Sequence, residues 1–341
     1  MTKSKKLFVA LAAVAAMSLA ACSSSDSAST TESSAAADTQ VVKKIAFFGF
    51  WKSNSFTQAV LAGVQEGAAA AGAEVVDLST AGYDAAAQIK AVQDQTIKGD
   101  AQMYVMLASD SVGMATAAQE AIAKGITVVA AFTPLGAKFD TLEPQVPGLV
   151  VVGETPISNG KVLAEIAVAA CEGKATCNVA YLEGFKALPL DNARTAAFVE
   201  TLKGSSVAGS KIKLVAQVEG GYAADSGKKA AQDVLQAHPE VNVMVGSSQA
   251  ILGATDVVDT TKVALIGNGS STEAYANVKS GKWFGLYNSD IKGMGVKSVE
   301  IGLAQANGQK PNPVFDTQTL LDAHGTKAII GDLMGTYSDL S

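Results

Sequence analysis

Along most of the chain, short apolar runs alternate with longer segments in which apolar residues recur at helical spacing. The first run, 44–50, precedes the segment 56–71, where Val60, Val64 and Ala68 lie on one stripe. Short apolar runs are typical of buried strands, and a stripe at four-residue spacing indicates an amphipathic helix. The next predicted elements are strands at 74–78, 103–107 and 127–131 and helices at 85–98 and 112–124. This order predicts a parallel sheet with helices on both faces.

A stretch with three prolines and a glycine, 132–147, interrupts this pattern. After a strand at 149–152 the alternation resumes and continues to residue 306. The strands of this second series are predicted at 178–182, 213–218, 241–245, 263–266 and 283–287, and its helices at 157–170, 191–202, 225–237, 250–258, 273–280 and 294–306. Two successive alternations of similar size predict an α/β fold with two doubly wound, Rossmann-like lobes.

Ligands of doubly wound sheets bind beyond the carboxyl ends of the strands. The loops at those ends are rich in Asn, Ser, Thr and aromatic residues, and their only basic side chains are Lys52, Lys186, Arg194 and Lys292. Aromatic faces cover C–H surfaces, while amides and hydroxyls bind oxygen atoms. The loop composition therefore favours a neutral polyhydroxy ligand.

The chain begins with the pattern of a secretory signal. Three lysines among the first six residues lead into the apolar run 7–21, which ends in Leu-Ala-Ala before Cys22. The run is shorter than the roughly twenty residues that span a bilayer. Its ending resembles a bacterial lipobox, so we expect a lipoprotein signal peptide at 1–21, acylation of Cys22 and a disordered tether at 22–41. A plain secretory signal with an unmodified cysteine is the alternative.

Charge and cysteine content exclude several classes of function. The formal net charge is −6 and no basic stripe occurs, so nucleic acid is not an expected partner. Besides Cys22 the chain holds only Cys171 and Cys177, which we expect to form a disulfide outside the cytoplasm, with two reduced thiols as the alternative. With His238 and His324 far from them in sequence, no metal site is predicted.

The sequence also lacks the usual marks of an enzyme. It has no Gly-x-Ser-x-Gly elbow, and both histidines lie in turn-like segments. We therefore expect neither enzymatic activity nor a cofactor.

Several short motifs, in order along the body, resemble the periplasmic sugar-binding proteins of the ribose and galactose type. They are Ile45-Ala46-Phe47-Phe48 leading to Asn54 and Phe56, and the runs 93–99, 237–240, 252–254 and 295–300. The resemblance implies a type 1 clamshell with three strands crossing at the hinge. The N-terminal lobe would comprise 42–153 plus 290–320, and the C-terminal lobe 154–289 plus 321–341.

The same resemblance implies the function and the partners. A monomer would capture a small sugar, polyol or sugar derivative and deliver it to the permease subunits of an ABC importer, while the lipid holds it at the cell membrane. A lipoprotein presenting the same ligand to a membrane receptor is the alternative function.

The resemblance and the loop rule together give a set of candidate ligand-binding residues. They are Phe50, Trp51, Asn54, Phe56, Phe132, Thr133, Asn192, Arg194, Tyr222, Ser247, Asn268 and Ser289. Asn192 and Arg194 each match an arginine of one family type, so one of the two should face the cleft.

Two aspartates that the family uses for sugar hydroxyls are replaced here, one by Phe132-Thr133 and one by Gly269. Because carboxylates form the stronger, charge-assisted hydrogen bonds, their loss argues against ribose or glucose. It favours a polyol, a deoxysugar or a modified sugar. A sugar acid would also fit if Arg194 lacked a protein carboxylate to balance it.

Overall fold

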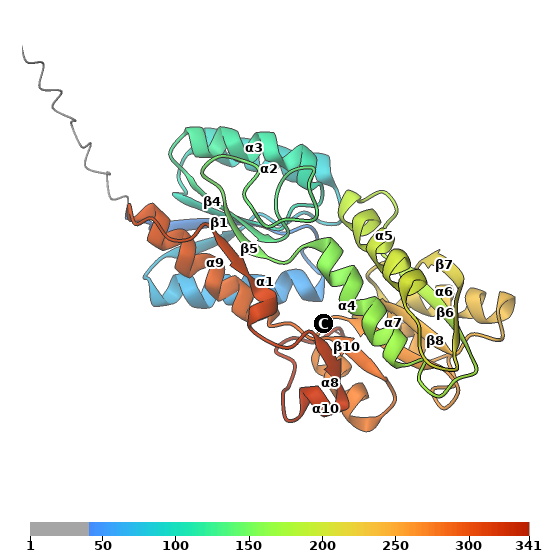
Figure 1. Ribbon diagram of the computed structural model, residues 1–341. Helices are drawn as coiled ribbons and strands as arrows, with labels where there is room; N and C mark the ends of the chain where they lie inside the picture. Colours follow the sequence, from blue (N-terminus) through green and yellow to red (C-terminus); the bar gives the residue numbers. More distant parts are fainter. Residues whose placement is uncertain (1–40, 341) are drawn as a thin grey trace, which may run out of the picture. The chain divides into compact units, whose positions relative to one another are not determined.

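The computed structural model describes residues 41–340 (Figure 1). The predictions for the signal peptide, for Cys22 and for nearly all of the tether concern residues outside this range. Within it, the chain forms two six-stranded sheets with helices on both faces of each. The predicted α/β class with two doubly wound lobes is confirmed.

The first sheet is entirely parallel. Its strands are β1 (Lys44–Phe48), β2 (Glu74–Asp77), β3 (Met103–Met106), β4 (Thr127–Phe132), β5 (Val150–Gly153) and β11 (Val314–Asp316). Their order across the sheet is β11-β5-β4-β3-β1-β2. The helices packed on it are α1 (Ser55–Ala70), α2 (Ala85–Lys98), α3 (Ser111–Ala123) and α9 (Ile291–Ala306).

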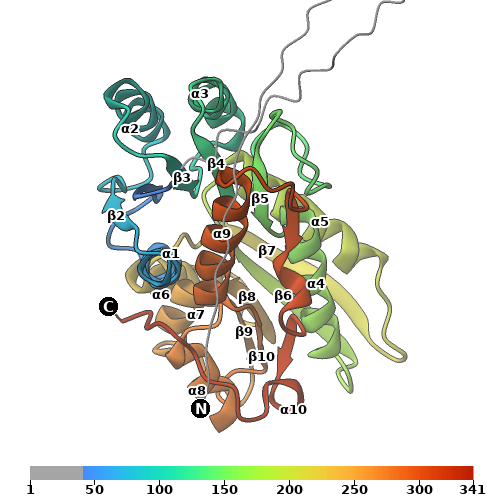
Figure 2. The ribbon, with the colours of Figure 1, turned by 90° about the vertical axis from the view of Figure 1, so that its left-hand side faces the viewer.

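The alternation of side chains along β1 decides which helices cover which face. Ile45 and Phe47 belong to the apolar cluster that includes residues of α1 and α9, whereas Ala46 and Phe48 belong to the cluster with α2 and α3. Figure 2 shows these two helix pairs on opposite sides of the sheet. Because successive strand residues point to opposite faces, a strand covered on both sides must be apolar throughout, as β1 is.

The second sheet repeats this arrangement with one exception. Its strands are β6 (Thr176–Glu183), β7 (Lys211–Glu219), β8 (Val243–Ser247), β9 (Ala264–Asn268), β10 (Gly285–Tyr287) and β12 (His324–Thr326), in the order β12-β10-β9-β8-β6-β7. Its helices are α4 (Pro156–Ala169), α5 (Pro189–Gly204), α6 (Ala224–Ala237), α7 (Ser248–Thr255), α8 (Thr272–Ser280) and α10 (Lys327–Ile330). Only β12 runs antiparallel, against β10.

The chain passes between the two sheets three times: from β5 into α4, from β10 into α9, and from β11 to β12. This is the three-crossing connection that the resemblance implies. The last crossing contains the elements that the sequence pattern did not predict, β11, β12 and α10, which are only three or four residues long. Runs this short carry no readable periodicity.

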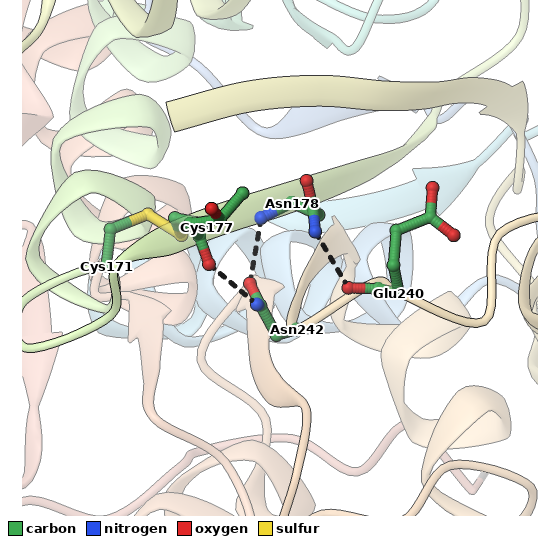
Figure 3. Close-up of a disulfide and its surroundings, with 6 residues drawn as sticks. Cys171, Cys177, Asn178, Glu240 and Asn242 are labelled. Atoms are coloured by element: carbon green, nitrogen blue, oxygen red, sulfur yellow. Dashed lines mark hydrogen bonds between the residues drawn. A yellow bond between two sulfur atoms is a disulfide. The ribbon is translucent and has the colours of Figure 1, made fainter. Parts of the chain in front are cut away.

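The Cys171–Cys177 disulfide is confirmed (Figure 3). It ties the turn after α4 to β6, and both cysteines are fully buried. Beside it, the Asn242 side chain accepts a hydrogen bond from Asn178 N at 2.9 Å and donates one to Thr176 O at 3.0 Å. The covalent and polar links together fix the start of β6 in the second lobe.

Candidate functional site

A cavity of about 70 Å³ lies at the carboxyl ends of the strands and is lined by residues of both lobes. This volume exceeds the roughly 10–15 Å³ that one buried water needs, so the cavity can admit a small ligand. The candidate residues from the sequence that line it are Phe50, Asn54, Phe56, Phe132, Arg194, Tyr222, Asn268 and Ser289.

Aromatic rings form most of the wall contributed by the first lobe. The Phe56 and Phe132 rings meet edge to face with centroids 4.8 Å apart, and Phe50 stacks on Tyr83 at 5.1 Å. Tyr83 in turn stacks on Tyr222 of the second lobe at 5.7 Å. Such rings offer flat apolar faces to the C–H surfaces of a ligand.

Phe132, one of the residues of this wall, has a strained backbone conformation. Its φ of 74° is the only positive value at a non-glycine residue in the described part of the chain. The strain occurs where β4 ends, and Phe132 O accepts a hydrogen bond from Glu154 N at 2.9 Å. Conformations of this kind cluster at functional sites, where surrounding contacts hold them in place.

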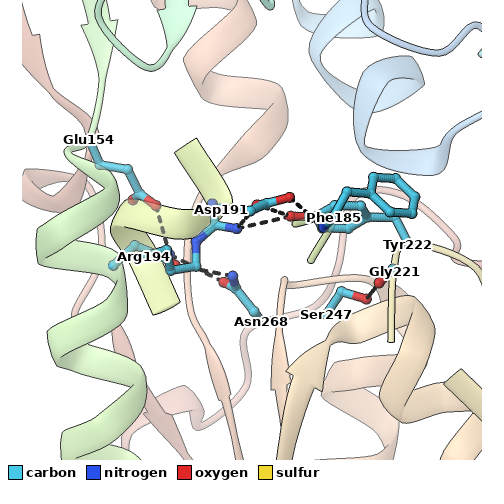
Figure 4. A network of polar contacts seen from close by, with 9 residues as sticks. Glu154, Phe185, Asp191, Arg194, Gly221, Tyr222, Ser247 and Asn268 are labelled. Carbon is cyan, nitrogen blue, oxygen red and sulfur yellow. Dashed lines mark hydrogen bonds and ion pairs between the residues drawn. The ribbon is translucent and has the colours of Figure 1, made fainter. Parts of the chain in front are cut away.

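Arg194 is the only arginine in the chain and lies at the centre of the polar contacts in the cavity (Figure 4). Its Nη1 donates to Asp191 Oδ1 at 2.9 Å and lies 3.0 Å from the Tyr222 hydroxyl. The Tyr222 hydroxyl donates to the same Asp191 oxygen. The guanidinium also lies 5.9 Å from the centre of the Phe132 ring. The buried Nε of Arg194 has no protein partner within residues 41–340.

The Arg194–Asp191 pair corrects one expectation. The sequence argument for a sugar acid assumed that Arg194 lacks a balancing protein carboxylate, and this was wrong. Both side chains are almost completely buried, and Phe185 N donates to the second Asp191 oxygen at 2.8 Å. Burial raises the pKa of Asp191, while the Arg194 charge and the bond from Tyr222 act in the opposite direction. The charge of Arg194 is thus compensated inside the protein.

A second carboxyl group, Glu154, reaches the cavity from the first crossing between the sheets. It accepts hydrogen bonds from Asn159 Nδ2 at 2.8 Å and from the Tyr287 hydroxyl. Burial raises its pKa to about 7, although both bonds and the Arg194 charge lower it. Asn159 also exchanges hydrogen bonds with Asn268 at 3.1 and 3.2 Å, so a polar chain follows this wall (Figure 4).

Asn54 has two roles in the structure. It precedes α1, and its Oδ1 accepts a hydrogen bond from Thr57 N at 3.1 Å, as a helix N-cap does. It also lines the cavity. A single amide thereby caps the start of α1 and borders the ligand site.

Four candidate residues do not line the cavity, and we remove them from the site. Trp51 contacts the edge of the Tyr83 ring at 6.0 Å and Thr133 is buried outside the cavity. Asn192 donates to Lys186 O at 3.0 Å, which leaves Arg194 as the residue of that pair in the cavity. Ser247 caps α7 and donates to Gly221 O at 2.7 Å, so its hydroxyl is occupied.

Several lining residues were missed by the sequence argument. They include Tyr83, Ser109, Glu154, Asp191, Gln249, Tyr287 and Tyr337. Tyr83 and Ser109 stood in loops at strand carboxyl ends, and Asp191 lies three residues before the sole arginine. These two signals were available. Tyr287 ends the predicted strand 283–287, so the same rule pointed to it, whereas Tyr337 gave no signal because tertiary structure alone brings it to the cavity.

Two α/β lobes with a cavity between them define a bilobal binding protein, and sequence and structure comparisons agree. The model of the periplasmic binding protein domain matches residues 45–310, so the chain belongs to this family. The family's members are solute-binding proteins, and membership implies a location outside the cytoplasm. A comparison with curated protein sequences found no match.

Solved structures show the same fold at low sequence identity. A carbohydrate transporter solute-binding protein from Agrobacterium radiobacter, in complex with D-arabinose, has a TM-score of 0.72 and 21% identity over 85% of this chain and 96% of that one. An ABC transporter periplasmic solute-binding protein from Actinobacillus succinogenes with bound D-allose has a TM-score of 0.69 and 21% identity, over 80% of this chain and 95% of that one. The Caulobacter myo-inositol binding protein bound to myo-inositol has a TM-score of 0.69 and 18% identity, over 80% of this chain and 90% of that one.

Neither a metal site nor a membrane span was found in the part of the chain that the structure describes. Residues 41–340 contain no cluster of His, Cys, Asp and Glu that could hold a metal ion. Among the same residues, none of the helices is long and apolar enough to cross a bilayer.

Proposed function

We propose that this protein is the extracytoplasmic substrate-binding lipoprotein of an ABC importer and that it captures a small neutral sugar or polyol between its lobes. The observation that carries the proposal is the cavity lined from both lobes by aromatic rings and hydrogen-bonding groups. Structural relatives with bound D-arabinose, D-allose and myo-inositol support the ligand class.

The charges of the cavity favour a neutral ligand over an acid. Arg194 is paired with Asp191, and Glu154 adds a further acidic group, so the site has no uncompensated positive charge for a carboxylate. An acidic ligand would have to give up hydration without gaining an opposite charge. A deoxysugar, a modified sugar or a polyol meets the aromatic wall with apolar surface and the polar wall with hydroxyls.

Uptake follows from two conformations of such a molecule. Ligand enters an open form of the protein. In the closed form, both lobes contact the ligand. The ligand favours closure only by its higher affinity for the closed form. A permease would recognise the closed form, and acylated Cys22 would keep the protein near it. We expect it to work as a monomer without nucleic acid, cofactor or enzymatic step.

Calorimetry with a defined panel tests the ligand class. The panel holds D-arabinose, D-allose, myo-inositol and D-fucose, with D-ribose and D-glucose as ordinary sugars and D-galacturonate as the acid. We expect affinity near micromolar, about 8 kcal/mol, for a member of the first group. Tightest binding of D-galacturonate would contradict the neutral ligand class, and tightest binding of D-ribose or D-glucose would contradict the sequence argument against these two sugars. Native mass spectrometry of the purified protein would identify a ligand that the panel lacks.

The membrane anchor needs a separate test. Mass spectrometry of the mature N-terminal peptide should find Cys22 as the first residue with a diacylglyceryl group. A Cys22→Ser variant should appear in the soluble fraction of a cell lysate. An unmodified cysteine in a protein that still fractionates with membranes would contradict the anchor.

A further inference from the structure

The C-terminal segment 331–340 returns to the mouth of the binding cavity after the last element of the second lobe. Figure 2 shows it running past α8 towards α7 and α1. It is held on the second lobe by Tyr337 O, which accepts hydrogen bonds from Thr272 N at 2.8 Å and Thr272 Oγ1 at 3.0 Å. Tyr337 also lines the cavity, and its hydroxyl accepts a bond from Ser270 N at 3.2 Å. The segment is therefore part of the wall of the site.

Two residues further on, the segment makes a contact across the lobes. Ser55, the first residue of α1 in the first lobe, donates from Oγ to Asp339 Oδ1 at 2.8 Å. The same Ser55 Oγ accepts a hydrogen bond from Gln249 Nε2 of α7 at 3.0 Å. One first-lobe hydroxyl is thus held between two second-lobe side chains; Ser55 and Gln249 are buried, and Asp339 is half-buried.

Opposing electrostatic effects act on the Asp339 carboxyl group, since burial and Glu273 raise its pKa, whereas hydrogen bonds from serine side chains lower it. The Asp339 side chain lies where α1, α7 and α8 begin, next to Ser55, Ser248 and the α8 cap Ser271. Helix N-termini carry unsatisfied N–H groups and a partial positive charge that attract anions. Two of these helices belong to the second lobe and one to the first, so the attraction across the cleft exists only when the lobes meet.

We propose that residues 335–340 are a latch that completes the ligand site and holds the two lobes together through Asp339 and Ser55. The segment stays on the second lobe when the cleft opens, and Ser55 leaves with the first lobe. Closure on a ligand therefore re-forms the Gln249–Ser55–Asp339 chain. The ligand-dependent part of this inference rests on the proposed function, whereas the effect on closure does not.

The test compares full-length Ser55→Ala and Asp339→Ala with the wild type. Asp332→Asn is the matched control, since Asp332 is an exposed acid on the same segment. Asp339→Asn keeps the acceptor oxygen and removes the charge. Acrylamide quenching of tryptophan fluorescence reports on the cleft, because Trp51 is half-buried beside Tyr83 and the other tryptophan, Trp283, is buried in the second lobe. Circular dichroism and thermal melting show whether each variant folds.

Without added ligand, Ser55→Ala and Asp339→Ala should each raise the quenching of Trp51, and Asp332→Asn should not. With D-arabinose, D-allose or myo-inositol as probe, whichever binds the wild type, both variants should bind about five- to ten-fold more weakly, mainly through faster dissociation. Asp339→Asn should lie between the wild type and Asp339→Ala.

Unchanged quenching in both alanine variants, with folding intact, would overturn the latch. If none of the three probes binds the wild type, the proposed ligand class fails, but the quenching comparison still decides the latch. A shorter chain that ends at Met334 provides a second route, since it lacks both Tyr337 and Asp339 and should give the largest rise in quenching.

Discussion

At the scale of single residues, the use of one arginine among 26 basic side chains shows what the cavity requires. A guanidinium stays charged when buried and donates in a fixed fork, so it can hold Asp191 and Tyr222 with one nitrogen and keep another donor for a ligand. A lysine carries its donors on a single nitrogen at the end of a flexible chain, without a second donor nitrogen held in a fixed plane. The surface needs only positive charge, which the lysines supply.

Replacing Arg194 by alanine should damage both binding and stability. Asp191 would be left buried with an uncompensated charge, which typically costs about 3–5 kcal/mol. We expect ligand affinity to fall more than ten-fold in calorimetry. The free energy of unfolding, measured in urea, should fall by about 3–5 kcal/mol. Arg194→Ala combined with Asp191→Asn should recover stability but not binding. Full recovery of binding in the double variant would exclude a direct contact of Arg194 with the ligand.

Glu154 should make stability depend on pH. Its pKa is 4.5 in the unfolded chain and about 7 in the folded protein, so the folded state holds the proton more tightly. Stability from this group is full below pH 4.5, declines as pH rises towards 7 and is constant above it, a total of at most about 3 kcal/mol.

A Glu154→Gln variant isolates this effect. Glutamine can still accept from Asn159 but does not titrate, so the wild type should lose stability relative to the variant between pH 5 and 7. Melting temperatures of both proteins across pH 4–8 provide the measurement, because acids elsewhere cancel in the difference. Parallel curves for the two proteins would contradict the raised pKa.

At the scale of elements, the pattern of apolar residues predicted most helices and strands to within one to three residues. The residues that pack between helices and sheet recur at the regular spacing of a strand or of a helix. The pattern could not predict β12, whose three residues pair only because β10 offers an edge. It missed the Asp191 partner and wrongly left Arg194 unbalanced, although the predicted helix 191–202 already placed the two residues three apart on one helix face.

Close helix packing gives the element-scale prediction. Gly295 of α9 faces α1 so closely that an added Cβ would lie 2.3 Å from Val60 O and 2.8 Å from Val64 N. Backbone atoms of a helix cannot yield as a flexible side chain does, so α9 would have to move. Gly295→Ala should reduce the free energy of unfolding by about 1–3 kcal/mol in urea titration.

A helical glycine elsewhere in the chain supplies the control. At Gly204, the last residue of α5, an added Cβ would meet nothing within 4 Å. Gly204→Ala should therefore be neutral or slightly stabilising, since alanine restricts the unfolded chain more than glycine does. Equal losses at both positions would show that packing between α1 and α9 is not the cause.

At the scale of the whole described body, the two lobes contact each other on both sides of the ligand cavity. The C-terminal segment provides one contact through Ser55 and Asp339. On the other, the Tyr83 ring lies against Tyr222 and Phe185 of the second lobe, with centroids 5.7 and 5.1 Å away. The sequence predicted two lobes and a hinge but neither contact, because each joins residues that only lobe closure brings together.

Loss of the Tyr83 ring should make the closed form less favourable and shorten the lifetime of the bound state. Aromatic pairs contribute about 0.5–1.5 kcal/mol beyond burial, and Tyr83 has two across the cleft. We expect Tyr83→Ala to weaken ligand binding about ten-fold, with most of the change in the dissociation rate measured by stopped-flow fluorescence. Tyr83→Phe keeps both ring contacts and should stay within about two-fold of the wild type. If Tyr83→Phe lost as much affinity as Tyr83→Ala, the hydroxyl would be a direct ligand contact and the ring would not be what holds the lobes together.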